Sequence, residues 1–416
     1  MKKITQTLEV PVRNECDVLV AGAGPAGIGA ALTAARMGAK VTLVEYGGKL
    51  GGMWTLGLLS PIFDNNKEGL NTELREKLME RKAWGGLWNL SFDPNEMTLL
   101  LNTLAIEAGV DVLLYPSACE PYMEDGNVRG VFIQNKSGRQ VILAKTVIDC
   151  TGDGDIAARA GCPFELGRAG DGGFQPMTMM FKIGGVRPEY PSGRILDWYT
   201  VLEKRMKGRY EEFMRDVPFN FPALVKLPRE GEALVQWTHV RGKSGCSGDE
   251  LSQAAQDGLC QVEHAMKYLA EVKDFLGDVY LEELPAVIGV RETRHIIGEY
   301  YITDDDLKSG KSQPDSICHV NMGVDIHEPF EKKQTNIPNP GFDIPFRSLV
   351  PLKAENLLTA GRCISGSFIP HAAYRVTGDC LKTGEGAGKM AVEAIRKGIT
   401  VRELSKQFYN SAKEVN

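Results

Sequence analysis

Residues 17–54, DVLVAGAGPAGIGAALTAARMGAKVTLVEYGGKLGGMW, decide the fold of this 416-residue chain. The segment opens with the apolar run VLVA (18–21), which predicts a short buried β-strand. The turn GAGPAG (22–27) leads directly into IGAALTAARMG, whose alanine and leucine content favours a helix. A second β run, KVTLVE (40–45), follows and ends in Glu45. Strand, glycine turn, helix and strand in this order predict a Rossmann-like βαβ unit.

The three glycines of the turn have separate roles in such a unit. Gly22 allows the tight turn, Gly24 lets the backbone approach a pyrophosphate without a Cβ atom, and Gly27 lets the helix pack closely on its strand. The helix N-terminus offers N–H groups and partial positive charge to phosphates. Glu45 can accept hydrogen bonds from both ribose hydroxyls and would repel a 2′-phosphate, which disfavours NADP. A glycine-rich turn without a ligand is the alternative, and the complete order of elements argues against it.

A second glycine pair indicates which dinucleotide is bound. After the ribose acid, the stretch GGKLGGMW (47–54) places Gly51 and Gly52 in a further piece of bare backbone. The ribityl chain and flavin of FAD could pass there, whereas an NAD dehydrogenase has no use for such a stretch. We therefore predict FAD as the cofactor.

The opening segment resembles the dinucleotide-binding motif of the glutathione-reductase-like flavoproteins. The chain as a whole resembles the bacterial FAD-dependent oxidoreductase family. Beyond the opening, this resemblance rests on three stretches, which are VIDCTGDGDIAARAG (147–161), LPAVIGVRETRHIIGEYYITDDD (284–306) and ENLLTAGRCISGSFIPHAAYRVTGDCLKTGEGAGKMA (355–391).

The chain divides into two predicted domains. Residues 162–346 break the alternation of short strands and helices, because β-like runs such as MTMMFKIGG mix with the helical stretch ELSQAAQDGLCQVEHAMKYLAEV. We interpret 162–346 as an inserted α+β substrate or cap domain. Residues 1–161 and 347–416 form a discontinuous FAD-binding domain, whose hairpin turns EDGN and KSGR predict a β-meander. The predicted fold class is α/β, a Rossmann-like FAD-binding domain with parallel sheet, meander and helices.

Composition limits the partners and the compartment. The formal net charge is −6 and no long Lys/Arg cluster is present, so we expect no nucleic-acid partner. The N-terminus has no apolar leader segment and no apolar run of about 18 residues follows, so we expect no membrane partner and a cytoplasmic location. The nine cysteines contain no CxxC pair, which favours reduced thiols and no metal site. A homo-oligomer is the expected default.

The resemblance assigns further cofactor contacts after the opening segment. In flavoproteins of this kind a strand with a Thr-Gly end lies beside the FAD, and Thr151 and Gly152 hold those places. Gly361 corresponds to backbone near the pyrophosphate and ribityl chain, and Arg362, where many relatives have aspartate, could neutralise phosphate charge. The last long helix begins near residues 377–378, whose N–H groups should face the N1 and O2 edge of the flavin. The predicted cofactor-binding residues are Gly22, Ala23, Gly24, Pro25, Ala26, Gly27, Glu45, Tyr46, Gly52, Met53, Trp54, Cys119, Thr151, Gly152, Gly361, Arg362, Thr377 and Gly378.

Three residues are the catalytic candidates. His371 and Arg375 lie in SGSFIPHAAYRVTGD, between the last strand and the flavin-facing helix. An imidazole titrates near neutrality, so His371 is the predicted general base or acid, and Arg375 could hold a substrate carboxylate, hydroxyl or developing oxyanion. The alternative is that both only position the loop and the flavin.

The third candidate, Arg291, belongs to a charged cluster with Glu292, Arg294 and His295 inside an apolar run. Buried charges must be paired or reach a polar cavity. A structural ion-pair network and a substrate site are therefore both open interpretations.

The predicted function is an FAD-dependent oxidoreductase that transfers a hydride between the flavin and a small polar substrate between the two domains. The resemblance suggests carbohydrate-like or hydroxylated compounds. One alternative is the reduction of an activated double bond, as in fumarate-reductase-like flavoproteins, with Arg375 or Arg291 as proton donor. Another is a flavin-binding protein without catalysis. No second dinucleotide-binding unit is present, so the second electron partner is an unidentified donor or acceptor.

Overall fold

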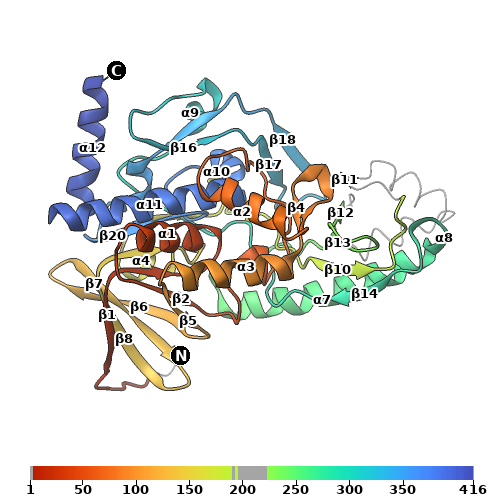
Figure 1. The fold of residues 1–416 in the computed structure, drawn as a ribbon, viewed down its shortest axis with the longest axis horizontal. Helices are drawn as coiled ribbons and strands as arrows, with labels where there is room; N and C mark the ends of the chain where they lie inside the picture. Colours follow the sequence, from red (N-terminus) through yellow and green to blue (C-terminus); the bar gives the residue numbers. More distant parts are fainter. Residues whose placement is uncertain (1–2, 190–192, 195–222, 416) are drawn as a thin grey trace.

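The computed structural model describes residues 3–189, 193–194 and 223–415, so parts of the predicted substrate domain lie outside the described residues (Figure 1). The main sheet has seven strands in the order β5-β2-β1-β8-β7-β6, with β20 also paired to β8. β1 runs parallel to β2 and to β8, and β2 runs parallel to β5. The strands are β1 (Val12–Ala21), β2 (Val41–Glu45), β5 (Asp111–Leu114), β6 (Ser117–Glu124), β7 (Asn127–Asn135), β8 (Gly138–Asp149) and β20 (Leu357–Thr359).

The sheet confirms the predicted α/β fold class, including the antiparallel meander β6-β7-β8. The last four residues of β1 are all buried, as expected for a parallel strand covered on both faces. β8 pairs with β7 along its first half and with β20 along its last three residues.

Helix α1 (Pro25–Arg36) follows the glycine turn and packs against α11 (Thr377–Lys397), the last long helix before the C-terminal one (Figure 1). Bare backbone makes this contact close. A Cβ atom on Gly29 would lie 2.3 Å from the carbonyl oxygen of Leu381, and one on Gly384 would lie 2.0 Å from that of Ala26. The small residues of both helices therefore bring the start of α11 next to the start of α1.

A second, antiparallel sheet of five strands forms the other part of the fold, in the order β11-β12-β13-β10-β14. Its apolar side packs with the long helix α7 (Gly248–Glu271) in a core that includes Phe181, Trp237 and Val262. This part has the α+β character that the sequence predicted, while the boundaries at 161/162 and 346/347 remain a prediction. The strands are β10 (Phe181–Gly184), β11 (Gly193–Arg194), β12 (Ala223–Lys226), β13 (Ala233–Gln236) and β14 (Tyr280–Glu283).

Short two-stranded ladders and small helices connect the two sheets. Among the described residues no helix is both long and apolar enough to cross a membrane. The remaining elements are β3 (Trp84–Gly85), β4 (Ser91–Phe92), β9 (Phe164–Leu166), β15 (Arg294–Ile296), β16 (Ser316–Val320), β17 (Val324–His327), β18 (Gln334–Ile337), β19 (Phe342–Pro345), α2 (Leu70–Glu80), α3 (Pro94–Glu107), α4 (Asp155–Arg159), α8 (Lys273–Leu276), α9 (Asp304–Ser309), α10 (Phe368–Tyr374), α12 (Val401–Val415) and the 3-10 turns η1 (Gly52–Trp54), η2 (Leu87–Asn89) and η3 (Phe346–Leu349).

Candidate active site

A cavity of about 980 Å³ begins at the carboxyl ends of the parallel strands and continues to the second sheet. Ligands of open α/β sheets bind at this edge, and the volume is at the upper end of the roughly 300–1,000 Å³ common for small-molecule sites. The lining comes from segments far apart in the chain and includes Gly22, Gly24, Pro25, Ala26, Glu45, Tyr46, Gly52, Met53, Thr151, Gly152, Thr178, Met180, Val225, Arg291, Asp325, His327, Gly361, Arg362, Arg375 and Thr377.

The glycine turn lines part of this cavity. Gly22 has φ +94°, and a Cβ atom there would lie 2.5 Å from the carbonyl oxygen of Cys150. A Cβ atom on Gly24, the residue that caps α1, would meet no protein atom within 4 Å. A Cβ atom on Gly52 would lie 2.7 Å from the Cα atom of Gly24. The helix N-terminus therefore opens onto a groove that bare backbone keeps clear, as a pyrophosphate site requires.

Glu45 is held at the end of β2 by the backbone of the same turn. Its carboxylate accepts hydrogen bonds from the N–H groups of Ala23 (2.8 Å) and Gly47 (2.7 Å). Burial raises the pKa of Glu45, and these two backbone donors oppose the shift. A carboxylate has about four acceptor positions, so two hydrogen bonds leave capacity for ribose hydroxyls. The role of Glu45 in ribose binding stays a prediction.

The end of β8 forms the opposite wall. The buried carboxylate of Asp149 accepts hydrogen bonds from the hydroxyl of Thr151 (2.7 Å) and from the N–H of Ala157 (2.9 Å), which fixes the turn that contains Gly152. Gly152 has φ +82°, and a Cβ atom there would lie 2.9 Å from the guanidinium of Arg362.

Arg362 lines the cavity, and its expected role of neutralising phosphate charge stays a prediction. Its Nη2 atom lies 2.7 Å from Oδ1 of Asp153, and its Nη1 atom donates to the hydroxyl of Thr293 at 3.1 Å. Although burial lowers the pKa of Arg362, the Asp153 carboxylate outweighs it and raises the pKa. The charge of Arg362 is therefore already compensated within the protein.

The segment that contains Phe63 and Asp64 crosses the N-terminus of α11 and covers part of it. Thr377 lines the cavity, but the N–H of Gly378 donates to the carbonyl of Phe63 at 3.2 Å. Gly378 is thus a packing glycine, which corrects its expected contact with the flavin. Behind it, the buried ammonium of Lys67 bridges the carboxylates of Asp379 (2.8 Å) and Asp64 (2.7 Å) and holds the crossing segment in place.

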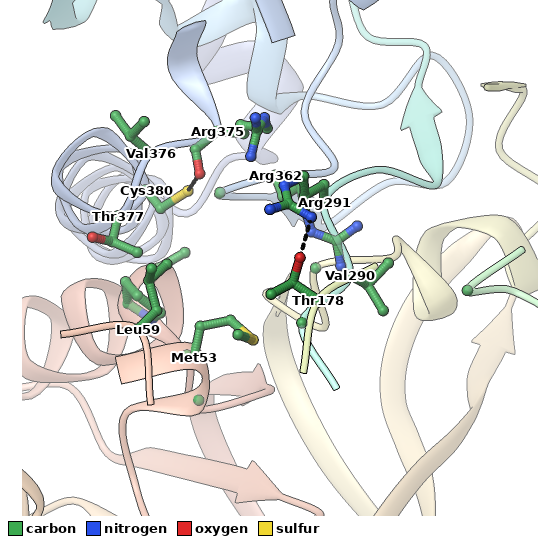
Figure 2. A pocket seen from close by; sticks show the side chains of 18 of the residues that line it. Met53, Leu59, Thr178, Val290, Arg291, Arg362, Arg375, Val376, Thr377 and Cys380 are labelled. Atoms are coloured by element: carbon green, nitrogen blue, oxygen red, sulfur yellow. Dashed lines mark hydrogen bonds between the residues drawn. The ribbon is translucent and has the colours of Figure 1, made fainter. Parts of the chain in front are cut away.

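Three arginines gather on one side of the cavity, across from Met53 and Leu59 (Figure 2). Arg291 donates to the hydroxyl of Thr178 at 2.6 Å and to the carbonyl of Pro176. Burial lowers the pKa of Arg291 to about 9, which still leaves the group charged at neutral pH. In the part of the chain that the structure describes, no carboxylate lies within salt-bridge distance of Arg291. Its positive charge therefore borders the cavity without a carboxylate in salt-bridge contact.

Arg375 closes the same end of the cavity and is paired. Its Nη2 atom donates to the backbone carbonyl of Asp325 at 2.7 Å and to Oε1 of Gln175 at 3.3 Å, and it lies 3.6 Å from the Asp325 carboxylate. Burial lowers the pKa of Arg375, whereas the Asp325 carboxylate opposes the shift.

Asp325 and His327 also line the cavity, and the sequence-based prediction missed both. They are two residues apart on β17, so both side chains leave the same face of the strand. Oδ2 of Asp325 lies 3.4 Å from Nε2 of His327. The alternation Asp-x-His in a β-like run was the signal that could have found this pair.

His371 does not line the cavity. Its side chain is 0% exposed on α10, between the rings of His295 (centroids 4.4 Å apart) and Tyr374 (5.4 Å). Burial lowers the pKa of His371 well below its ordinary value, so the ring is neutral. This placement corrects the expectation that His371 exchanges a proton directly with a substrate, and it supports the alternative that His371 positions the loop before α11.

The charged cluster around Arg291 separates into two kinds of residue. Arg294 pairs with Asp155 at 2.9 Å, and Nε2 of His295 lies 3.3 Å from Oε1 of Glu292. These residues support the structural interpretation. Arg291 alone lines the cavity, which supports the substrate-site interpretation for that residue.

Besides Gly378, four predicted cofactor-binding residues do not line the cavity. Ala23 and Gly27 are buried behind the groove, where a Cβ atom on Gly27 would lie 1.8 Å from the carbonyl oxygen of Gly22. Trp54 is 0% exposed and packs edge-on against Phe92. Cys119 does not line the cavity, and the two residues before it on β6 do. These four residues support the groove from behind or beside it.

The fold and the cavity define a class. The groove fits an adenine dinucleotide, because it combines a glycine turn at a helix N-terminus, the acid Glu45 at a strand end and the bare backbone of Gly52. The apolar continuation of the cavity fits an isoalloxazine ring. The protein is therefore a flavoprotein. It matches the FAD dependent oxidoreductase family over residues 17–415 and belongs to that family, and its cofactor is FAD.

Known proteins are similar to this chain at two levels. The digeranylgeranylglycerophospholipid reductase of Methanoculleus marisnigri is 30% identical over 177 residues, which are 36% of this chain and 42% of that protein. The chain thus aligns with less than half of this curated relative. The flavin-dependent brominase Bmp2 shares the fold with a TM-score of 0.54 at 10% identity, covering 96% of this chain and 84% of the brominase. The p-nitrophenol 4-monooxygenase PnpA of Pseudomonas putida aligns with a TM-score of 0.52 at 11% identity, covering 95% and 84%.

Proposed function

We propose that this FAD-dependent enzyme transfers a hydride between the flavin and a small hydroxylated substrate that carries an oxygen-rich or anionic group, bound between the two sheets. The observation that carries the proposal is the charge of Arg291, which faces the cavity with only neutral hydrogen-bond acceptors around it. A buried cation without a carboxylate partner is costly unless a ligand supplies one. A substrate carboxylate or polarised oxygen fits this role.

Different residues of the cavity would bind different parts of the substrate. Arg291 would hold the oxygen group, and Arg375, fixed by Asp325, would limit its orientation. Apolar side chains at the second sheet, Met180 just before β10 and Val225 on β12, would cover the reacting carbon and keep water away. Bound FAD supplies a two-electron acceptor or donor, and an unidentified second partner returns the flavin to its starting state.

Reduction of an activated double bond is the second candidate, and one observation favours it. Burial lowers the pKa of Arg291 to about 9, which makes this guanidinium a better proton donor than an exposed one. The curated relative is named as a reductase, although it aligns with only 42% of its length. In this reaction Arg291 would protonate the carbon next to the one that receives the hydride.

Anaerobic half-reactions test and separate the two candidates. The oxidised holoenzyme is mixed with hydroxy acids and polyols, and the photoreduced holoenzyme with enoates and with keto compounds, while flavin absorbance is followed. We expect bleaching by a hydroxylated compound and reoxidation by its keto partner. Reoxidation by enoates alone would overturn the hydroxyl version.

Substitution of Arg291 tests its proposed role of binding the oxygen-rich or anionic group of the substrate. Arg291→Met should weaken substrate binding by roughly 10–100-fold, since a hydrogen bond to a charged group contributes about 1.5–3 kcal/mol. Arg291→Lys keeps the charge and should recover part of the affinity. Arg294→Met is the matched control, because Arg294 is paired with Asp155 and does not line the cavity. Equal losses in the Arg291 and Arg294 variants would contradict the assigned role.

A further inference from the structure

The short hairpin of β3 and β4 carries an exposed tryptophan to the cavity. The two strands pair Trp84 with Phe92, and the turn η2 between them contains Trp88. Trp88 lines the cavity and is 62% exposed. The other tryptophans that the structure describes, Trp54, Trp84 and Trp237, are at most 9% exposed. The indole of Trp88 therefore stands at the opening of the cavity and does not pack in a core.

Hydrogen bonds at the base of this hairpin hold it against the cavity wall. The hydroxyl of Ser60 donates to the carbonyl of Phe92 at 2.6 Å and accepts from the N–H of Phe92 at 2.8 Å. The N–H of Ile62 donates to the carbonyl of Leu90 at 3.1 Å. Pro61, between these two anchoring residues, lines the cavity. The base of the hairpin is thus tied to a segment that forms part of the wall.

The tip of the hairpin rests on the second sheet, beside β12 (Figure 1). Gly86 has φ +74°, and a Cβ atom there would lie 2.0 Å from the carbonyl oxygen of Lys226, the last residue of β12. Val225 of the same strand lines the cavity, whereas Leu224 packs in the core with α7 on the opposite face of the sheet. The tip therefore brings the indole of Trp88 to the side of the cavity where the second sheet contributes apolar side chains.

The backbone that presents this indole is strained. Trp88 has φ +47° and ψ +23°, and Asn89 has φ +59°. The left-handed region is unfavourable for a bulky side chain and is found where the surrounding structure imposes it, often at ligand sites. With the residues that the structure describes, the indole forms no aromatic or cation–π contact. Packing within the protein therefore does not account for the position of this ring.

We propose that Trp88 is a specificity-determining residue whose indole stacks on a ring of the substrate, so that the substrate is a hydroxylated acid that carries a ring. This inference rests on the proposed function, in which Arg291 of the same cavity binds the anionic group. An indole offers a large apolar face with a π system. It attracts the face of an aromatic ring and the C–H face of a sugar ring through the same dispersion and burial of apolar area. Trp88 therefore favours ring-bearing acids over open-chain acids.

Calorimetric titration of the oxidised holoenzyme tests this preference without turnover. The probes are benzoate and glucuronate, which carry a ring, and their open-chain counterparts hexanoate and gluconate. We expect Trp88→Ala to raise the Kd of at least one ring acid about tenfold, since an aromatic contact and the burial of a ring face are lost together, and to change the open-chain Kd values much less. The ring acid that responds distinguishes an aromatic from a sugar substrate. The proposal is overturned if neither ring acid binds the wild type more tightly than its counterpart, or if Trp88→Ala binds both ring acids as the wild type does.

Stability measurements separate a ligand-binding role of this ring from a structural one. Trp88→Gly removes the indole and relieves the strain at φ +47°, so the urea midpoint should stay the same or rise while the affinity for the ring acid falls. Asn89→Gly is the matched control, because Asn89 is the next residue, has φ +59° and does not line the cavity. It should leave the affinity for the ring acid unchanged. A lower urea midpoint of Trp88→Gly, or an equal loss of affinity in both glycine variants, would contradict the proposal.

The outcomes separate the two proposals. If a hydroxylated compound reduces the wild-type flavin but Trp88→Ala binds both ring acids as the wild type does, the role of Trp88 is refuted and the proposed function stands. If Trp88→Ala loses affinity for a ring acid but no hydroxylated compound reduces the wild-type flavin, the ring-binding role of Trp88 stands and the proposed function fails.

Discussion

Three glycine-to-alanine substitutions in the first βαβ unit separate the effects of steric clash, backbone strain and obstruction of the cofactor groove. Gly22→Ala places a Cβ atom 2.5 Å from the carbonyl oxygen of Cys150 at φ +94°. Gly38→Ala has a similar φ of +91° but meets no atom within 4 Å. Gly24→Ala meets no protein atom within 4 Å, and no positive φ strains it. The three variants therefore test clash with strain, strain alone, and obstruction of the groove.

The magnitudes follow from these contacts. Strain at a positive φ costs about 1–3 kcal/mol and an overpacked contact about 1–3 kcal/mol, so Gly22→Ala should lower the free energy of unfolding by about 2–6 kcal/mol. Gly38→Ala should lower it by the strain alone, about 1–3 kcal/mol. Gly24→Ala should lower it by about 1 kcal/mol or less, because alanine is a poorer N-cap than glycine. Its FAD affinity, however, should fall at least about tenfold, since one hydrogen bond to a charged phosphate contributes about 1.5–3 kcal/mol.

The assay measures two quantities on each variant, the urea unfolding of the apoprotein and the Kd for FAD. We expect Gly24→Ala to fold like the wild type and bind FAD weakly, and Gly38→Ala to lose stability and keep its affinity. A Gly24→Ala protein with wild-type affinity would refute the reasoning, because the pyrophosphate could not then lie against this backbone. Unchanged stability of Gly22→Ala would refute the packing argument separately.

Two further predictions concern buried charges. Lys67→Met should lower the free energy of unfolding by about 3–5 kcal/mol, because it leaves the carboxylate of Asp379 without its cation, and adding Asp379→Asn should recover part of the loss. Urea unfolding of both variants measures this, and a single-variant loss below about 1 kcal/mol would contradict it. The second prediction follows from the lowered pKa values of His239, His327 and His371, which burial causes. Because the unfolded chain binds protons near pH 6.5 and these rings do not, stability should be complete above pH 6.5 and fall on acidification, by about 1.4 kcal/mol per pH unit for each ring. His371→Asn should reduce that slope by one ring in unfolding experiments between pH 7 and 5, and a flat profile would disprove the assignment.

The sequence was sufficient for the groove because its signals are local. A strand, a glycine turn and a helix are neighbours in the chain, so their order alone predicted the groove from Gly22 to Gly52, and the structure places the bare backbone there. The same reasoning was weaker at α10. His371 and Arg375 are four residues apart near the start of α11, yet only Arg375 reaches the cavity, because the orientation of a short helix depends on tertiary packing.

The contacts among polar residues far apart in the sequence could not be predicted, because these residues meet only in the folded chain. His239 and His327 are 88 residues apart, and their 2.7 Å contact joins the segment after β13 to the separate ladder of β17 and β18. The sequence also could not predict which arginines of the cavity are paired with a carboxylate. From the sequence, Arg291, Arg362 and Arg375 are equivalent cations, and only the distances to their carboxylate partners distinguish them.

The pairing of these arginines explains how one cavity can serve two ligands of different charge. Asp153 compensates Arg362 and Asp325 compensates Arg375, so neither contributes a net charge to the site. Among the described residues that line the cavity, Arg291 is the arginine without a carboxylate within salt-bridge distance. In the proposed arrangement, helix N–H groups would hold the phosphates of FAD, and the charged side chain of Arg291 would be left for the substrate.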